Sequence, residues 1–196
     1  MLLSIATVLA AYLLGSVSTA IVVCRLSGLP DPRSQGSRNP GATNVLRTGR
    51  KGAAIITLLG DSLKGLVPVL VAHALGLEPA WVAAVALAAF LGHLYPVYHG
   101  FQGGKGVATA LGVLLGLNAF VGLATLATWL VVAALARISS LAALTAATLT
   151  PVYTHLLTGE FWYTIATVLL ALLVYWRHRA NVGRLLAGEE PRFGKG

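Results

Sequence analysis

Long apolar stretches with almost no charged side chains leave this chain only one class of fold. Six of them cover residues 2–23, 53–77, 80–98, 107–136, 139–157 and 161–176. A helix that crosses a bilayer needs about 20 apolar residues, with about 17 as the usual lower limit. Lipid offers the backbone no hydrogen-bond partner, so stretches of this kind must form helices. We therefore predict an all-α, polytopic membrane helix bundle, formed as a single domain over residues 1–196.

The basic residues mark one side of the membrane. Six Lys and Arg lie within residues 25–51, five within 177–195, and one each at positions 105 and 137. Cytoplasmic segments carry an excess of such cations, so these four places, and with them the C-terminus, are predicted to be cytoplasmic. The turns around Glu78 and Glu160 hold no cation and belong outside. The net charge of +8 then follows from topology and from attraction to lipid headgroups, and it needs no nucleic-acid partner.

The apolar stretch 107–136 decides the number of crossings. Because both of its ends are predicted to be cytoplasmic, it crosses the membrane twice or not at all. Two crossings leave about 14 residues for each helix, or about 21 Å at 1.5 Å per residue, with residues 116–118 as the outer turn. We predict seven transmembrane helices, some of them short, with the N-terminus outside. Five helices plus a re-entrant segment are the alternative, and both arrangements put every basic motif on the cytoplasmic face.

The polar segment 36–47 follows the first apolar stretch and has the sequence Gly-Ser-Arg-Asn-Pro-Gly-Ala-Thr-Asn-Val-Leu-Arg. Its glycines permit close backbone approach, its hydroxyl and amide groups supply donors, and a guanidinium group can bind phosphate through two parallel hydrogen bonds. The plain alternative is a capped, basic loop at the membrane surface. The density of small donors favours a phosphate site, with the candidate ligands Ser37, Asn39, Thr43, Asn44 and Arg47.

A glycine-rich segment, residues 103–107 with the sequence Gly-Gly-Lys-Gly-Val, opens the stretch 107–136. Free N–H groups at a helix N-terminus attract anions, and Gly104 and Lys105 are the candidates here. The segment is not a nucleotide-binding P-loop, because Gly106 stands where Ser or Thr is required. It predicts a site for a phosphate-sized anion without bound nucleotide and magnesium. A flexible helix start with an interfacial cation is the alternative.

The end of the last apolar stretch carries His178, Asn181 and Arg184 at steps of three residues. On a helix this spacing puts their side chains on one face. The histidine is then a general base, a hydrogen-bond donor to phosphate or a plain interfacial aromatic residue. Spacing alone favours the plain interpretation.

Asp61 and Lys64 are charged residues inside an apolar stretch. A charge at membrane depth costs about 2.5–3.5 kcal/mol on insertion scales and usually marks a site, a pathway or an internal pair. The separation of three residues lets the two side chains pair on one helix face. A buried structural pair and a functional pair are equally good interpretations.

Taken together, these motifs resemble the bacterial acyl-phosphate:glycerol-3-phosphate acyltransferases, small integral-membrane enzymes of phosphatidic acid synthesis. The family pattern G-S-x-N-x-G-A-T-N-x-x-R matches residues 36–47 at every fixed position, and G-G-K-G-V-A-T matches residues 103–109. R-H-x-x-N-x-x-R-L matches residues 177–185, Gly-Asp-x-x-Lys-Gly matches 60–65, and residues 137–140 are similar to a family segment that ends in two serines. Gln102 and Ile138 depart slightly, because the family commonly has a lysine and an aromatic residue there.

The resemblance implies transfer of a fatty acyl group from acyl phosphate to the 1-hydroxyl of glycerol 3-phosphate, which gives 1-acyl-glycerol 3-phosphate (lysophosphatidic acid) and phosphate. It implies a multi-pass protein of the bacterial cytoplasmic (inner) membrane whose active site faces the cytoplasm. Acyl phosphate is already activated, so we expect no cofactor and no metal. The Cys and His spacing, with Cys24 as the single cysteine, also indicates no metal site.

The resemblance further suggests roles for the candidate residues. Ser37, Arg47, Lys105, Ser140 and backbone N–H groups are expected to hold the two phosphates, with Asn181 orienting the substrate. Arg184 is a further candidate for binding phosphate. His178 is the first choice for the base that accepts the hydroxyl proton, and the alternative is that the leaving phosphate takes it. A small transporter of a phosphate compound is the rival class, but no matching polar set lies on the outer face.

Overall fold

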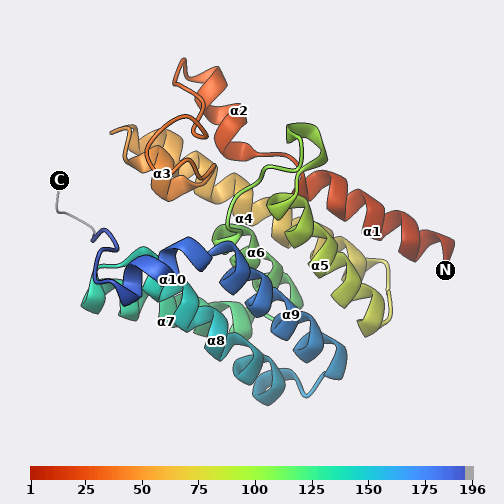
Figure 1. The fold of residues 1–196 in the computed structure, drawn as a ribbon. Coiled ribbons are helices and arrows are strands. Elements are labelled where there is room, and N and C mark those ends of the chain that lie inside the picture. The colour runs from red at the N-terminus through yellow and green to blue at the C-terminus, as the bar shows by residue number, and fades with distance from the viewer. Residues whose placement is uncertain (193–196) are drawn as a thin grey trace.

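The computed structural model describes residues 1–192, which form helices joined mostly by short loops (Figure 1). The prediction of an all-α bundle is confirmed for this part of the chain. In chain order the elements are α1 (Leu2–Gly15), α2 (Thr19–Leu26), α3 (Ala42–Leu46), α4 (Lys51–Ala74), α5 (Pro79–Leu94), the 3₁₀ turn η1 (Val97–His99), α6 (Val107–Leu117), α7 (Ala119–Ala136), α8 (Ser139–Thr158), α9 (Phe161–Arg177) and α10 (Arg179–Leu186).

Helix α5 forms the centre of the bundle. It packs against α1, α4, α6 and α9, and its side chains Val82, Val85, Ala89 and Phe90 are fully buried. Helix α7 is at the opposite extreme, because it packs mainly against α6 and α8 and leaves Leu123, Leu130 and other large apolar side chains exposed. An apolar surface of this kind is suited to contact with lipid.

Glycines let two pairs of helices approach one another closely. A methyl group on Gly65 of α4 would overlap the backbone of Thr109 in α6, and one on Gly112 of α6 would overlap the carbonyl oxygen of Ser62 in α4. The same reciprocal contact joins α1 to α5 through other glycines. Small residues at helix interfaces are the usual means of packing in membranes, where lipid is as apolar as the side chains.

The first apolar stretch, residues 2–23, does not form a single straight helix. It is bent by 42° between α1 and α2, and Ser18 is in an extended conformation at the break. The break removes the helical partner of the Val17 carbonyl, which instead accepts a hydrogen bond of 2.6 Å from Lys64 Nζ on α4. A tertiary contact, invisible in the local hydropathy, thus stabilises the bend.

The stretch 107–136 divides where the sequence predicted a turn. Helix α6 ends at Leu117, and the side chain of Asn118 caps α7 by accepting hydrogen bonds from the N–H groups of Phe120 and Val121. By length and composition, α4, α5 together with η1, and α7 can each cross a membrane, and the bent pair α1–α2 can form a fourth span. Helices α6 and α9 are apolar but shorter. The count of seven crossings and the orientation stay predictions.

Candidate functional site

Five polar side chains from four segments meet beside the start of α8. Ser140 Oγ, Asn181 Nδ2 and Arg184 Nε all donate hydrogen bonds to the carboxylate of Glu190, at 2.7 Å for Ser140 and for Arg184. The Oδ1 atom of Asn181 accepts a hydrogen bond of 2.6 Å from Lys105 Nζ. The structure therefore brings together four of the residues that the sequence suggested for substrate binding, around an anion supplied by the chain itself.

Glu190 is the residue of this cluster that the sequence interpretation missed. It belongs to no motif, and the only signal was an acidic pair, Glu189 and Glu190, within a strongly basic tail. Burial raises the pKa of the Glu190 carboxyl, but the hydrogen bonds from Ser140, Asn181 and Arg184 outweigh that effect and hold it below its usual value. The carboxylate is therefore ionised at neutral pH.

Lys105 lies in the loop between η1 and α6, half-buried among other cations. Burial lowers the pKa of Lys105 to about 8; the charge of Glu190 opposes this shift, and the charges of Arg184, Arg47 and Arg177 reinforce it. Arg47, at the end of α3, and Arg184, in α10, are thus both close enough for their charges to lower the pKa of Lys105. The site is thus a basic surface that the folded chain assembles from remote segments.

The glycine-rich loop is held by Arg177, the last residue of α9. Its guanidinium group donates to the carbonyl oxygens of Gly104, at 3.0 Å, and Gly103, at 2.6 Å, and lies over the ring of Tyr95. Gly106 is the N-cap residue of α6 with φ +82°, a conformation suited to glycine. The prediction that this segment opens a helix is confirmed.

Gly104 itself is not an open backbone donor. Its N–H group donates to the carbonyl oxygen of His93, at 3.2 Å, and a methyl group at this position would overlap the imidazole of the same histidine. The glycine is needed here for close packing against α5. Its place is therefore to position Lys105, the next residue along the chain.

His178 separates α9 from α10 and is buried. Its Nδ1 atom lies 2.8 Å from the carbonyl oxygen of Val174, and because a carbonyl can only accept, Nδ1 carries the hydrogen and Nε2 the lone pair. Burial lowers the pKa of His178 to about 4; the hydrogen bond to Val174 opposes this shift, and the positive charge of Lys105 adds to it. The imidazole is neutral at pH 7 with a defined tautomer, as the general-base role requires, but it is a weak base.

The segment 36–47 forms a loop around one buried amide. The Oδ1 atom of Asn44 accepts a hydrogen bond from the N–H group of Ser37, and its Nδ2 atom donates to the carbonyl oxygens of Pro32 and Gln35, at 2.8 and 3.0 Å. All of these bonds stay within residues 32–44, so Asn44 shapes this part of the chain. The side chains of Ser37, Thr43 and Arg47 are exposed, and Asn39 is half-buried.

Asp61 and Lys64 make no hydrogen bond to the Glu190 cluster within the described residues and lie on the face of α4 that packs inside the bundle. Asp61 Oδ1 is 2.9 Å from Lys64 Nζ and 3.8 Å from Nδ1 of His93, and all three side chains are buried. The predicted pair on one helix face is thus present. Lys64 links it to the bend at Val17, and His93 links it to the glycine-rich loop.

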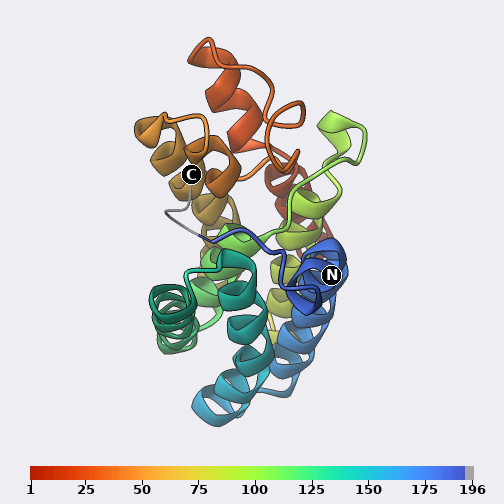
Figure 2. The same cartoon turned by 60° about the vertical axis from the view of Figure 1, so that its left-hand side comes forward.

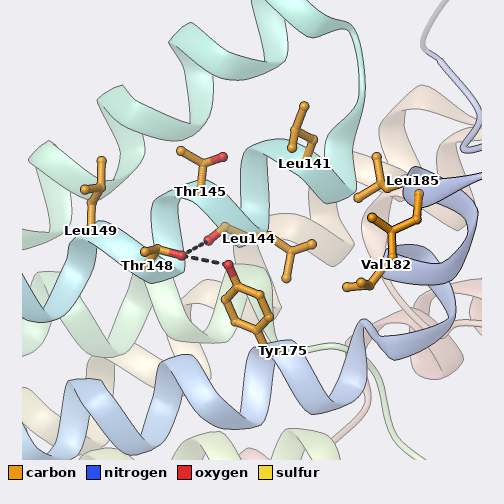
Figure 3. A pocket seen from close by; sticks show the side chains of 9 residues that line it. Leu141, Leu144, Thr145, Thr148, Leu149, Tyr175, Val182 and Leu185 are labelled. Carbon is orange, nitrogen blue, oxygen red and sulfur yellow. Dashed lines mark hydrogen bonds between the residues drawn. The ribbon is translucent and has the colours of Figure 1, made fainter. Parts of the chain in front are cut away.

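An apolar groove of about 440 Å³ runs between α8, α9 and α10 (Figure 3). Leucines of α8 and α10 supply most of its lining, together with Val182. Thr148 and Tyr175 are joined across it by a hydrogen bond of 2.8 Å. The lining residues Leu141 and Leu185 directly follow Ser140 and Arg184 in sequence, so the groove begins at the polar site.

Three comparisons with known proteins agree with one another. The family model described as Glycerol-3-phosphate acyltransferase matches residues 5–188. Glycerol-3-phosphate acyltransferases from Thioalkalivibrio sulfidiphilus and Methylococcus capsulatus are 82% and 59% identical; the alignments cover 99% and 94% of this chain and 96% and 93% of the relatives. The crystal structure of PlsY, an integral membrane glycerol 3-phosphate acyltransferase in its glycerol 3-phosphate form, superimposes with a TM-score of 0.93 at 38% identity, over 97% of this chain and 96% of that one.

Proposed function

The chain belongs to the glycerol-3-phosphate acyltransferase family, and on this basis we propose that it uses acyl phosphate as the acyl donor. The acyl group passes to the 1-hydroxyl of glycerol 3-phosphate, and the products are lysophosphatidic acid and inorganic phosphate. A solved relative, PlsY, is described in a lysophosphatidic acid form, which supports this product. The reaction takes place at the cytoplasmic face of a bacterial inner membrane, to which the excess of lysine and arginine assigns the basic segments.

The observation that carries the proposal is the convergence of Ser140, Asn181 and Arg184 on one carboxylate beside Lys105. Hydroxyl, amide and guanidinium donors aimed at a single small anion, with an ammonium group bonded to one of them, are the donors that a phosphate group requires. Arg47 adds a further positive charge to the same region. It lies on the loop that also carries Ser37, Asn39 and Thr43, which are the proposed ligands of the second phosphate.

In the reaction, the hydroxyl oxygen of glycerol 3-phosphate attacks the carbonyl carbon of the acyl phosphate, and the bond from this carbon to the phosphate oxygen breaks. Negative charge grows on the carbonyl oxygen and on the leaving phosphate. Lys105 and Arg184 stabilise this charge from fixed positions. The proposed phosphate ligands hold both substrates in line for the attack. The mixed anhydride supplies the driving force.

The hydroxyl proton has two possible acceptors. His178 Nε2 holds a lone pair and accepts a hydrogen bond from the hydroxyl, which orients it for attack. With a pKa of about 4, His178 is a poorer proton acceptor than a phosphate group, whose second ionisation lies near pH 6. We therefore assign the proton to the leaving phosphate and hydroxyl orientation to His178, and this reverses the preference drawn from the sequence.

The apolar groove next to Ser140 is the proposed place of the acyl chain. It is open along α8 and α10 and lined mainly by apolar side chains, so a fatty chain loses contact with water there. Because the groove starts beside Ser140, the carbonyl group of the fatty acyl chain lies near the proposed phosphate ligands. A product formed in this way remains beside the membrane.

The test is an assay of the purified full-length protein in detergent, with acyl phosphate and acyl-CoA compared as donors. Turnover with acyl phosphate is expected, whereas a transporter has no activity without two compartments. Arg47→Ala is expected to lower kcat/KM about ten- to a hundredfold, because a charge-assisted hydrogen bond is worth about 1.5–3 kcal/mol. Arg50→Ala, an exposed arginine close to the same loop, is the matched control. Turnover with acyl-CoA and none with acyl phosphate would refute the proposed donor.

A further inference from the structure

The phosphate-type site of this protein already holds an anion, the Glu190 carboxylate. Three donors converge on it, from Ser140, Asn181 and Arg184, and its side chain is only 8% exposed. Lys105 is bonded to the same asparagine. These are the groups that we assign to substrate phosphate, so Glu190 stands where the substrate is expected to bind.

The same donors cannot serve both anions at once. The hydroxyl of Ser140 and the Nε atom of Arg184 each have a single hydrogen, and both hydrogens are directed to Glu190. A phosphate at this position would also lie against the carboxylate, and two negative charges in contact repel each other. A phosphate that takes the hydrogens of Ser140 Oγ and Arg184 Nε therefore displaces the carboxylate.

The tail that carries Glu190 is built to move away. Among residues 187–192, every residue except Glu190 is exposed. The tail is attached through this side chain and through backbone hydrogen bonds from Gly188 and Glu189 to the last turn of α10, at 3.2 and 2.8 Å. The tail turns at Gly188, whose φ of +71° suits glycine. Figure 2 shows it, in deep blue, crossing the molecule beyond α10. Rotation about this turn can withdraw the carboxylate while the helices stay in place.

We propose that Glu190 is an internal competitor of the substrate phosphate and that its displacement sets the affinity for glycerol 3-phosphate. The inference rests on the proposed function, in which Ser140 and Arg184 bind phosphate. If the carboxylate occupies the site in about nine molecules of ten, the apparent dissociation constant of the substrate is raised about tenfold. The carboxylate also neutralises the neighbouring cations while the site has no substrate.

The test compares Glu190→Gln with wild type and with the control Glu189→Gln, which changes the adjacent, exposed carboxylate. Glu190→Gln is expected to raise kcat/KM for glycerol 3-phosphate about tenfold through a lower KM, and Glu189→Gln to change neither. Inorganic phosphate is expected to raise the melting temperature of Glu190→Gln at about tenfold lower concentration than that of wild type. A fall in kcat/KM, or unchanged phosphate protection, would overturn the proposal and make Glu190 a fixed positioning residue.

Two further variants keep the outcomes separate. Glu190→Asp retains the charge on a shorter side chain and is expected to change KM in the same direction by a smaller factor, which provides a test even if the glutamine variant does not fold. Ser140→Ala tests the premise: it is expected to weaken phosphate protection in the Glu190→Gln background. If Ser140→Ala has no effect there, the proposed phosphate site is wrong. If it has an effect while Glu190→Gln does not tighten phosphate binding, only the proposal that Glu190 competes with the substrate is wrong.

Discussion

The ammonium group of Lys105 donates a hydrogen bond of 2.6 Å to the side-chain oxygen of Asn181, which lies 76 residues further along the chain. The bond joins the loop before α6 to α10 and ties together two motifs that are separate in the sequence. It uses one of the three hydrogens of the ammonium group. The other two remain for a substrate, and the amide holds the lysine in place.

The first prediction concerns the pH dependence of phosphate binding. Because the pKa of Lys105 is lowered to about 8, the side chain is charged below this pH and loses its proton as the pH rises through it. We expect kcat/KM for glycerol 3-phosphate, which reports the free enzyme, to fall above pH 8. Lys105→Arg keeps its charge at these pH values and should shift the fall to higher pH. The measurement is kcat/KM from pH 6 to 10 in both proteins, and superimposable profiles would exclude Lys105 as the titrating group.

The second prediction separates the two roles of His178. Since the pKa of His178 is lowered to about 4, it does not titrate near pH 6, where the substrate phosphate does. His178→Asn is therefore expected to lower kcat about ten- to a hundredfold, as expected for one lost hydrogen bond to a charged or reacting group. The acid limb of the pH–rate profile near pH 6 should persist. Loss of that limb, together with a fall in rate of about 10²–10⁴, would restore His178 as the general base.

The third prediction concerns the buried pair on α4. Asp61→Asn leaves the ammonium group of Lys64 buried without its counter-charge, and breaking a buried pair in this way costs about 3–5 kcal/mol. A marked fall in the melting temperature in detergent is expected. The double variant Asp61→Leu with Lys64→Met removes both charges and should recover part of the loss, with the Val17 carbonyl left unbonded. Lys51→Met, at the exposed start of the same helix, is the control.

If the double variant is no more stable than Asp61→Asn alone, the two residues do not act as a structural pair. If it is stable but inactive, the pair has a functional part as well. The measurement is therefore made twice on each protein, once by thermal unfolding and once by acyl transfer.

The fourth prediction concerns topology. Single cysteines at Gln35, Gln102 and Ala187, introduced into a Cys24→Ala background, should react only with reagents on the cytoplasmic side. A cysteine at Glu78, in the turn between α4 and α5, should react from outside. All four introduced positions are exposed, so a lack of labelling reports the side of the membrane and not burial. Labelling of Ala187 from outside would refute the odd number of crossings.

Local patterns in the sequence were sufficient to predict many of the helices. The apolar stretches 139–157 and 161–176 coincide with α8 and α9 to within a residue, because lipid forces every apolar segment of sufficient length to satisfy its own backbone. The turn at Asn118 was also visible, as a polar residue within an uncharged stretch. The bend near Val17 was not, since it is stabilised by Lys64 from another helix.

The sequence by itself determined which residue types are available to the site: the donors, the cations and the flexible glycines are all present in its motifs. Only the tertiary structure decided how each is used. It turned Asn44 inward to shape a loop, directed Nδ1 of His178 to Val174 and placed Glu190 among the hydrogen-bond donors that we propose bind phosphate. The physical reason is that periodicity and motif spacing report neighbours along one helix, whereas each of these roles depends on hydrogen-bond partners and burial that exist only after the helices have packed.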